Sequence, residues 1–316
     1  MWCYACKGDW IQAYNYADIL LEESLWSKTV YMHLKASFRV MARLVNQKIV
    51  REGEEGRNDT ESYMFRHLPD FKQRIAGQSL PFENFAIHKA NKYFEQNGRL
   101  FLPGVELMYI WNGFKVLSHR PDLVQPLMKL VENSLHKLKQ TKDENKNYVD
   151  DYCLGKLLQA MCYRCLNKKN EAMECLRNSF NRSKDLKKDF YLAPYTCAEI
   201  GFLYQDEGDL DRAKEYLERA RKHRDHMLQS LLHLRIHAAL QEIEHNGMGR
   251  DRSPVLHEKE FVQNAQNKQG TESNEDTAAS ANDDDFFDAE EDCVPNLSRQ
   301  DSNSSFDIIS DFADEV

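Results

Sequence analysis

Two pairs of cysteines have the spacing of zinc ligands. Two residues separate Cys3 from Cys6, and two separate Cys162 from Cys165. The two pairs of a structural zinc site are usually about 12 to 20 residues apart, whereas these lie about 156 residues apart. Inside a helix this spacing places both thiols on one face, and free cysteine is among the residues most often buried. We therefore interpret the cysteines as core residues and predict no metal and no other cofactor.

Histidines and catalytic motifs lead to a similar expectation. His233 and His237 lie one helical turn apart, as two zinc ligands of a metalloprotease do, but no glutamate between them could act as the base. The chain contains no phosphate-binding glycine loop and no Gly-x-Ser-x-Gly segment. We expect a protein that is not an enzyme; metal-dependent hydrolysis would require zinc to be found bound.

One basic run, residues 219–224, has the composition of a nucleic-acid contact. It contains no aromatic side chains on which bases could stack. It also comes at the end of a predicted helix, where the helix dipole favours cations. We predict no nucleic-acid partner.

The elements that carry these residues are predicted to be helices. Apolar residues recur at spacings of three and four, and only 13 glycines and 8 prolines occur in 316 residues. No segment alternates for long enough to form a sheet. Pro81 and Pro103 mark helix boundaries, and Pro121 marks a helix start. The predicted helices are residues 10–23, 27–48, 62–76, 84–96, 104–118, 122–140, 149–166, 170–181, 190–206, 209–223 and 227–244.

The composition and the first residues of the chain also indicate its cellular compartment. The mean hydropathy is -0.70, and no stretch approaches the roughly 18 apolar residues of a membrane span. Residues 1–4 lack the basic start and apolar run of a signal peptide. We expect a cytoplasmic protein with reduced thiols.

Residues 197–220 fit the tetratricopeptide pattern, a helix pair of about 34 residues. Gly201, Ala213 and Ala220 are the small residues that let two helices approach, while Tyr204 and Leu217 fill the space between repeats. A looser copy has Ala160, Tyr163, Ala172, Leu176 and Ser179, and a third has Tyr4, Gly8, Asp9 and Ala13. The prediction is an all-α, TPR-like α-solenoid of antiparallel helix pairs over residues 1–245.

The third copy matches only the second half of the pattern. The chain begins three residues before Tyr4, so the first helix of that repeat is cut short. We expect an exposed apolar end around Trp2, Tyr4, Trp10 and Tyr14. This favours the interpretation that the chain is a fragment or an N-terminally shortened form of a longer solenoid.

Three segments resemble the tetratricopeptide repeat protein 39 family, which is related to the fungal inclusion-body clearance proteins. They are residues 75–85 followed by 89–90, residues 102–113, and residues 231–240. The resemblance covers residues 1–245, and family members are generally longer on the N-terminal side. It implies an α-solenoid scaffold without catalysis, associated in some members with lipid homeostasis, lipid droplets or protein clearance.

Tetratricopeptide grooves commonly hold peptides, and the chaperone-binding kind holds a terminal carboxylate with Lys and Asn one turn apart. Here the inner-facing candidates are Leu157, Met161, Ala198 and Phe202, all apolar. We therefore expect an apolar or helical protein client in the solenoid groove rather than a chaperone tail.

The C-terminal part has a different composition from the rest. The net charge of -9 divides into 15 acidic and one basic residue within 271–316, and 36 acidic and 41 basic residues elsewhere. Residues 246–282 are predicted to be a disordered linker and residues 293–316 a disordered, acidic, serine-rich tail, because both contain too little apolar material to offset the entropy of ordering. Phe306, Ile308, Ile309 and Phe312 give only a weak indication of a second motif.

Residues 283–292 place two adjacent phenylalanines among seven acidic residues. They resemble the FFAT motif, which binds the cytosolic domain of the VAP proteins of the endoplasmic reticulum; the usual first residue is Glu where this chain has Asp. By this resemblance Phe287 and Ala289 enter apolar pockets, and Asp288 and Glu291 meet basic residues. The alternative is an acidic tail that only solubilises the chain. The predicted contact residues are Asp285, Phe286, Phe287, Asp288, Ala289 and Glu291.

Two hypotheses of function follow. In the first, the chain is an adaptor whose solenoid holds a protein client while the FFAT-like segment recruits it to the endoplasmic reticulum or near lipid droplets. In the second, the solenoid presents clients to the ubiquitin or protein-clearance machinery, and the tail is incidental.

Overall fold

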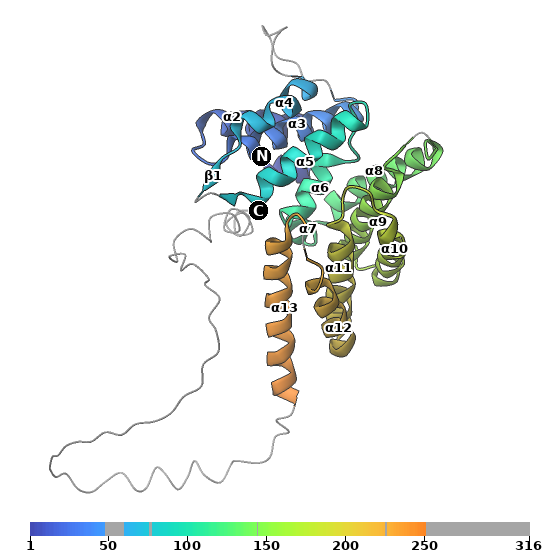
Figure 1. Cartoon of the computed structure of the whole chain (residues 1–316). Helices are drawn as coiled ribbons and strands as arrows, with labels where there is room; N and C mark the ends of the chain where they lie inside the picture. The colour runs from blue at the N-terminus through green and yellow to red at the C-terminus, as the bar shows by residue number, and fades with distance from the viewer. Residues whose placement is uncertain (48–59, 76–77, 144, 225, 251–316) are drawn as a thin grey trace, which may run out of the picture. The chain divides into compact units, whose positions relative to one another are not determined.

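A computed structural model describes residues 1–47, 60–75, 78–143, 145–224 and 226–250 (Figure 1). Residues Met1–Glu244 form one compact unit, and a second begins at His245. The described residues of the second unit, 245–250, continue the backbone of the last helix. The FFAT-like segment and the tail lie outside the described residues.

The described chain consists of helices and one short hairpin. The first half contains α1 (Trp2–Cys6), α2 (Trp10–Glu23), α3 (Lys28–Leu44), α4 (Glu61–His67), the 3₁₀ turn η1 (Leu68–Phe71), β1 (Arg74–Ile75), β2 (Gln78–Ser79), α5 (Pro81–Glu95), α6 (Pro103–Ile110) and α7 (Gly113–Leu117). The second half contains α8 (Pro121–Gln140), α9 (Tyr148–Cys165), α10 (Lys169–Arg182), the 3₁₀ turn η2 (Ser183–Asp185), α11 (Leu192–Glu207), α12 (Leu210–Arg221) and α13 (Gln229–Arg250).

The all-α fold class is confirmed. Figure 1 shows α9 with α10 and α11 with α12 as successive antiparallel pairs, and α10 packs on α11. Prolines occupy the first turns of α5, α6 and α8, as expected of a residue whose missing N–H costs nothing there.

Three predicted elements differ from the structure. The helix predicted for residues 62–76 ends at His67, because Pro69 lacks the N–H that would continue the hydrogen-bond ladder; η1 and the antiparallel pair β1–β2 follow. The helix predicted for 104–118 is divided at Asn112, whose φ is +61°. The helical backbone of α13 runs on to Arg250, past residue 244, where the last helix was predicted to end.

One backbone turn occurs at all three repeat copies. In each, a backbone N–H donates to the carbonyl of a tyrosine five residues earlier, as in a Schellman helix end. The three turns are Tyr4 to Asp9 (2.9 Å), Tyr163 to Lys168 (2.9 Å) and Tyr204 to Asp209 (3.0 Å). The residue before each donor has positive φ: +72° at Gly8, +57° at Asn167 and +81° at Gly208. Asp9 and Asp209 then cap the N-termini of the helices that follow, α2 and α12.

The small residues of the repeat pattern lie where two helices of a pair meet. A Cβ atom added to Gly201 would lie 2.8 Å from the Cγ atom of Leu217. Leu217 is itself buried. The remaining small positions are also buried: Ala13, Ala160, Ala172, Ala213 and Ala220. Tyr163 is half-buried.

We expect Gly201→Val to lower the free energy of unfolding by about 1 to 3 kcal/mol, because the added methyl groups overlap Leu217 in a packed interface. Chemical denaturation of the two proteins measures the difference. Glu207→Val, at an exposed position of the same helix, is the matched control and should change stability by less than about 0.5 kcal/mol. Equal stability of the Gly201 variant and the parent would contradict close packing here.

The expected exposed apolar end is wrong for Trp10 and Tyr14, which are both buried. They are covered because α3 and α6 pack against this end of the unit: the Trp10 ring lies 6.1 Å from that of Phe38, and a Cβ on Gly104 would lie 2.9 Å from Trp10. Trp2 is half-buried. Tyr4 is also half-buried and stacks on Tyr16, which is 42% exposed.

Candidate functional site

The four inner-face positions proposed to line an open groove are all buried. Phe202 is 8% exposed, and the guanidinium of Arg235 on α13 lies 4.9 Å from its ring. On α9, Leu157 and Met161 belong to a helix that packs against α6, α7 and α8. Helices of the same chain therefore cover these four side chains.

A buried carboxylate joins the helices that fill this groove. Glu199 of α11 accepts hydrogen bonds at Oε1 from the Tyr109 hydroxyl of α6 (2.8 Å) and from Arg235 Nη2 of α13 (2.7 Å). Its Oε2 accepts from Arg164 Nη1 of α9 (3.0 Å). Burial would raise the pKa of Glu199, but the two guanidinium groups outweigh it and hold that pKa below its usual value. We call these four residues the Glu199 cluster.

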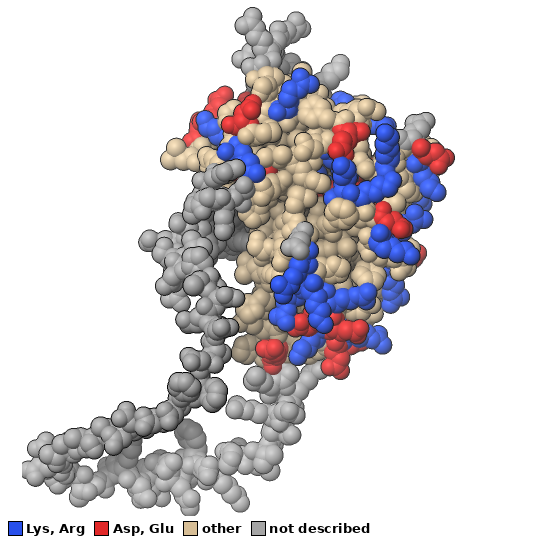
Figure 2. All heavy atoms as spheres, viewed as in Figure 1, with Lys and Arg blue, Asp and Glu red and all other residues tan. Residues whose placement is uncertain are grey.

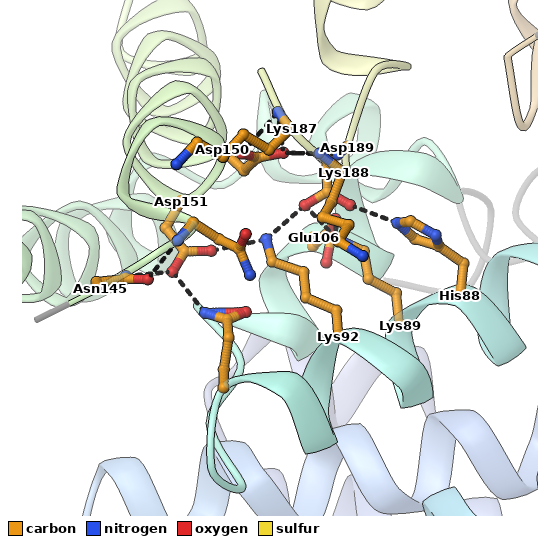
Figure 3. A network of polar contacts seen from close by, with 12 residues as sticks. His88, Lys89, Lys92, Glu106, Asn145, Asp150, Asp151, Lys187, Lys188 and Asp189 are labelled. Atoms are coloured by element: carbon orange, nitrogen blue, oxygen red, sulfur yellow. Dashed lines mark hydrogen bonds and ion pairs between the residues drawn. The ribbon is translucent and has the colours of Figure 1, made fainter. Parts of the chain in front are cut away.

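A second buried group of charges lies between α5, α6, α9 and the segment before α11 (Figure 3). Lys89 and Lys92 of α5 both donate to Asp189 Oδ2, at 2.9 and 2.6 Å. Lys89 also contacts Glu106 of α6 (2.5 Å), and Lys92 also contacts Asp151 of α9 (2.8 Å). None of the five side chains is more than 4% exposed. We call these five residues the Asp189 cluster.

Hydrogen bonds at the edge of this cluster hold the segment before α11 in place. Asp150 Oδ1 accepts from the backbone N–H groups of Lys188 and Asp189, both at 2.7 Å, and Oδ2 accepts from that of Lys187 at 3.1 Å. His88 Nε2 lies 3.1 Å from Asp189 Oδ1. Asp150 thus acts as a clamp that brings Asp189 to the two lysines.

The carboxylates of the Asp189 cluster differ in their electrostatics. Burial raises the pKa of Glu106, which has Lys89 as its only ammonium partner here. Burial acts on Asp189 in the same direction, yet Lys89 and Lys92 together outweigh it and hold the pKa of Asp189 well below its usual range. Asp189 is the carboxylate of the cluster that both lysines share.

The geometry of both clusters indicates a structural role. A catalytic carboxylate needs access to a substrate and a pKa matched to its task, whereas Asp189 and Glu199 are no more than 1% exposed and paired with cations of the chain. Residues far apart in sequence are joined instead: 100 residues separate Lys89 from Asp189. What this arrangement does is fix the helices of the first unit to one another.

The cysteines and histidines considered as zinc ligands lie in settings that do not favour metal. Burial raises the pKa of Cys6 and Cys165 to about 11. Cys162 is buried, and burial raises its pKa further. His237 is exposed. Among the residues described, no three His, Cys, Asp or Glu side chains are placed to hold a metal ion.

The basic run ends α12 and is partly engaged within the unit. Arg219 lies 4.8 Å above the ring of Phe180, and Arg221 pairs with Glu218 at 2.7 Å. Figure 2 shows blue and red side chains mixed around α12 rather than a surface of one sign. Within the described ranges, no helix combines the length and the apolar composition of a membrane span.

These features define the chain as a tetratricopeptide-type repeat protein, a class whose members are generally non-enzymatic, protein-binding scaffolds. The family model described as Iml2/Tetratricopeptide repeat protein 39 matches residues 1–166, and a tetratricopeptide repeat model matches residues 194–220. Neither describes a catalytic family.

The chain belongs to the Iml2/tetratricopeptide repeat protein 39 family. Among curated proteins it is similar to tetratricopeptide repeat protein ttc-39B of Caenorhabditis elegans, with 31% identity over 240 residues. The match covers 76% of this chain and 39% of that relative, so the chain spans about two fifths of the relative's length. No solved structure matches it.

The sequence did not reveal the two buried clusters. Lysines 89 and 92 read as ordinary polar positions of a helix, and nothing local points to a partner 100 residues away. The available signal was the family-like segment 102–113, which carries Gly104, Glu106 and Tyr109. In the structure Gly104 packs against α3, Glu106 belongs to the Asp189 cluster and Tyr109 belongs to the Glu199 cluster.

Proposed function

We propose that the chain is a non-enzymatic scaffold that is recruited to the endoplasmic reticulum when residues 285–291 bind VAP proteins. The observation that carries the proposal is the pair Phe286 and Phe287 among seven acidic residues, outside the helical unit that ends at Glu244. Aromatic side chains in so acidic a segment have little apolar sequence around them to bury against, and a pocket on a partner supplies that burial. The proposed link between this recruitment and lipid homeostasis rests on the family resemblance alone.

We expect charged and apolar residues of the segment to contribute to binding in different ways. The acidic flank speeds the encounter with a basic surface. A phenylalanine that fills a pocket contributes about 1.5 to 3 kcal/mol, and ordering the segment offsets part of this gain. The net expectation is a micromolar dissociation constant.

The burial of the four inner-face positions affects where a protein client can bind. Since α13 and α6 cover the inner-face positions, we propose that protein clients contact other surfaces of the unit. The unit then serves as a rigid platform, and the acidic segment determines its location.

The proposal predicts that Phe287→Ala weakens binding of the full chain to the VAP domain by at least about tenfold, because it empties an apolar pocket. Isothermal titration at one fixed ionic strength measures the dissociation constants.

The matched control is Phe306→Ala, which removes a phenylalanine from another part of the same acidic tail and should leave the affinity unchanged. Full binding by the Phe287 variant would refute the proposal, as would equal losses in both variants.

A further inference from the structure

A cavity of about 620 Å³ opens between the end of α3, residues 96–102 and α8. Much of its wall is aliphatic or aromatic, supplied by all three segments. Its apolar lining residues are Val40, Leu44, Val45, Leu100, Phe101, Leu102, Leu130 and Leu138. Its volume falls within the roughly 300 to 1,000 Å³ range of small-molecule sites.

Gln96 lines the cavity and is held by a hydrogen bond within the chain. The residue is 8% exposed, and its Nε2 donates to Asp151 Oδ2 at 3.0 Å. That bond fixes the orientation of the Gln96 amide, because a flipped amide would place its carbonyl oxygen against the carboxylate of Asp151. Its Oε1 is buried and has no hydrogen-bond partner among the described residues.

The charged side chains of the wall favour an anion. Arg43, Arg99 and Lys137 line the cavity and are exposed. Asp151 is the acidic residue among the lining residues, and its carboxylate already accepts bonds from Lys92, Gln96 and Asn145. Arg43 also faces Glu61 at 3.4 Å, which leaves Arg99 and Lys137 as the cations best placed to meet a ligand.

We propose that this cavity binds a small organic anion with an apolar body. The anionic group meets Arg99 and Lys137, and the body packs on the leucine-rich wall. This binding is separate from recruitment by residues 285–291, so failure of one leaves the other unaffected.

Two fluorescent probes test the proposal with the full chain. Anilinonaphthalene sulfonate carries an anionic group, an apolar body and one N–H donor, and phenylnaphthylamine has the same body and donor without the charge. We expect the sulfonate to bind at one site per chain and more tightly than the uncharged probe.

Variants of the wall locate the site. Ser134→Phe, at a half-buried lining position, should reduce the affinity for both probes at least about tenfold by filling the cavity. The double variant Arg99→Gln, Lys137→Gln should weaken the sulfonate about fivefold and leave the uncharged probe unchanged. Lys139→Gln, on the same helix but outside the lining residues, is the control and should bind both probes as the parent does.

The proposal is overturned if the sulfonate binds several sites per chain, or if both wall variants bind it as the parent does. It is also overturned if an acidic, phenylalanine-containing peptide displaces the sulfonate while small aromatic carboxylates do not, because the cavity would then be a peptide site. Circular dichroism and thermal midpoints establish that each variant is folded; if Ser134→Phe is not, the charge variant and its control decide the outcome.

Discussion

Replacing Asp189 with asparagine should lower the free energy of unfolding by about 3 to 5 kcal/mol, the usual effect of removing one partner from a buried ion pair. The variant leaves two buried ammonium groups, on Lys89 and Lys92, without the carboxylate they share. Urea denaturation followed by circular dichroism measures the change.

Asp185→Asn is the matched control for this experiment. It makes the same chemical change four residues earlier, at an exposed position of η2, and should alter stability by less than about 0.5 kcal/mol. If the two variants were equally stable, the Asp189 cluster would not hold α5 against the segment before α11.

We expect Glu199→Gln to destabilise the chain by about 3 kcal/mol at neutral pH, because it leaves Arg164 and Arg235 facing an uncharged amide. The effect should centre on α13, because Arg235 of this helix pairs with Glu199 of α11 at 2.7 Å. Hydrogen exchange of α13 amides, compared with those of α3, tests this: we predict faster exchange in α13 and little change in α3.

The pH dependence of this difference has a definite sign. The pKa of Glu199 in the folded chain lies below its usual value, so its charge contributes stability above the unfolded pKa of about 4.3. That contribution is lost as the pH falls through the folded pKa. The stability gap between parent and variant should therefore be full at pH 7 and shrink below about pH 4; a gap that is constant down to pH 3 would contradict the proposed role of the charge.

Much of the fold could be predicted because its signals are local. Helix periodicity, prolines at helix starts and the glycine of the Gly208 turn act within a few residues. The same pattern predicts that Gly201 lets the two helices of its pair approach, and its contact with Leu217 lies within that pair.

The rest depended on contacts between distant parts of the chain. Nothing near Phe202 in sequence indicates that Arg235 covers it, so an apolar inner face was interpreted as an open groove. Trp10 was expected at an exposed end for the same reason, although α3 and α6 cover it. The lesson is that an apolar repeat face predicts burial, but not whether a client or the chain itself supplies it.

The most direct test of the proposed recruitment is the location in cells of the full chain compared with one that lacks residues 283–292. We predict that the full chain co-localises with the endoplasmic reticulum and that the shortened chain becomes diffuse, as should a chain carrying both Phe286→Ala and Phe287→Ala. Unchanged reticular localisation of the shortened chain would contradict recruitment by this segment and would favour a scaffold that presents clients for clearance with an incidental tail.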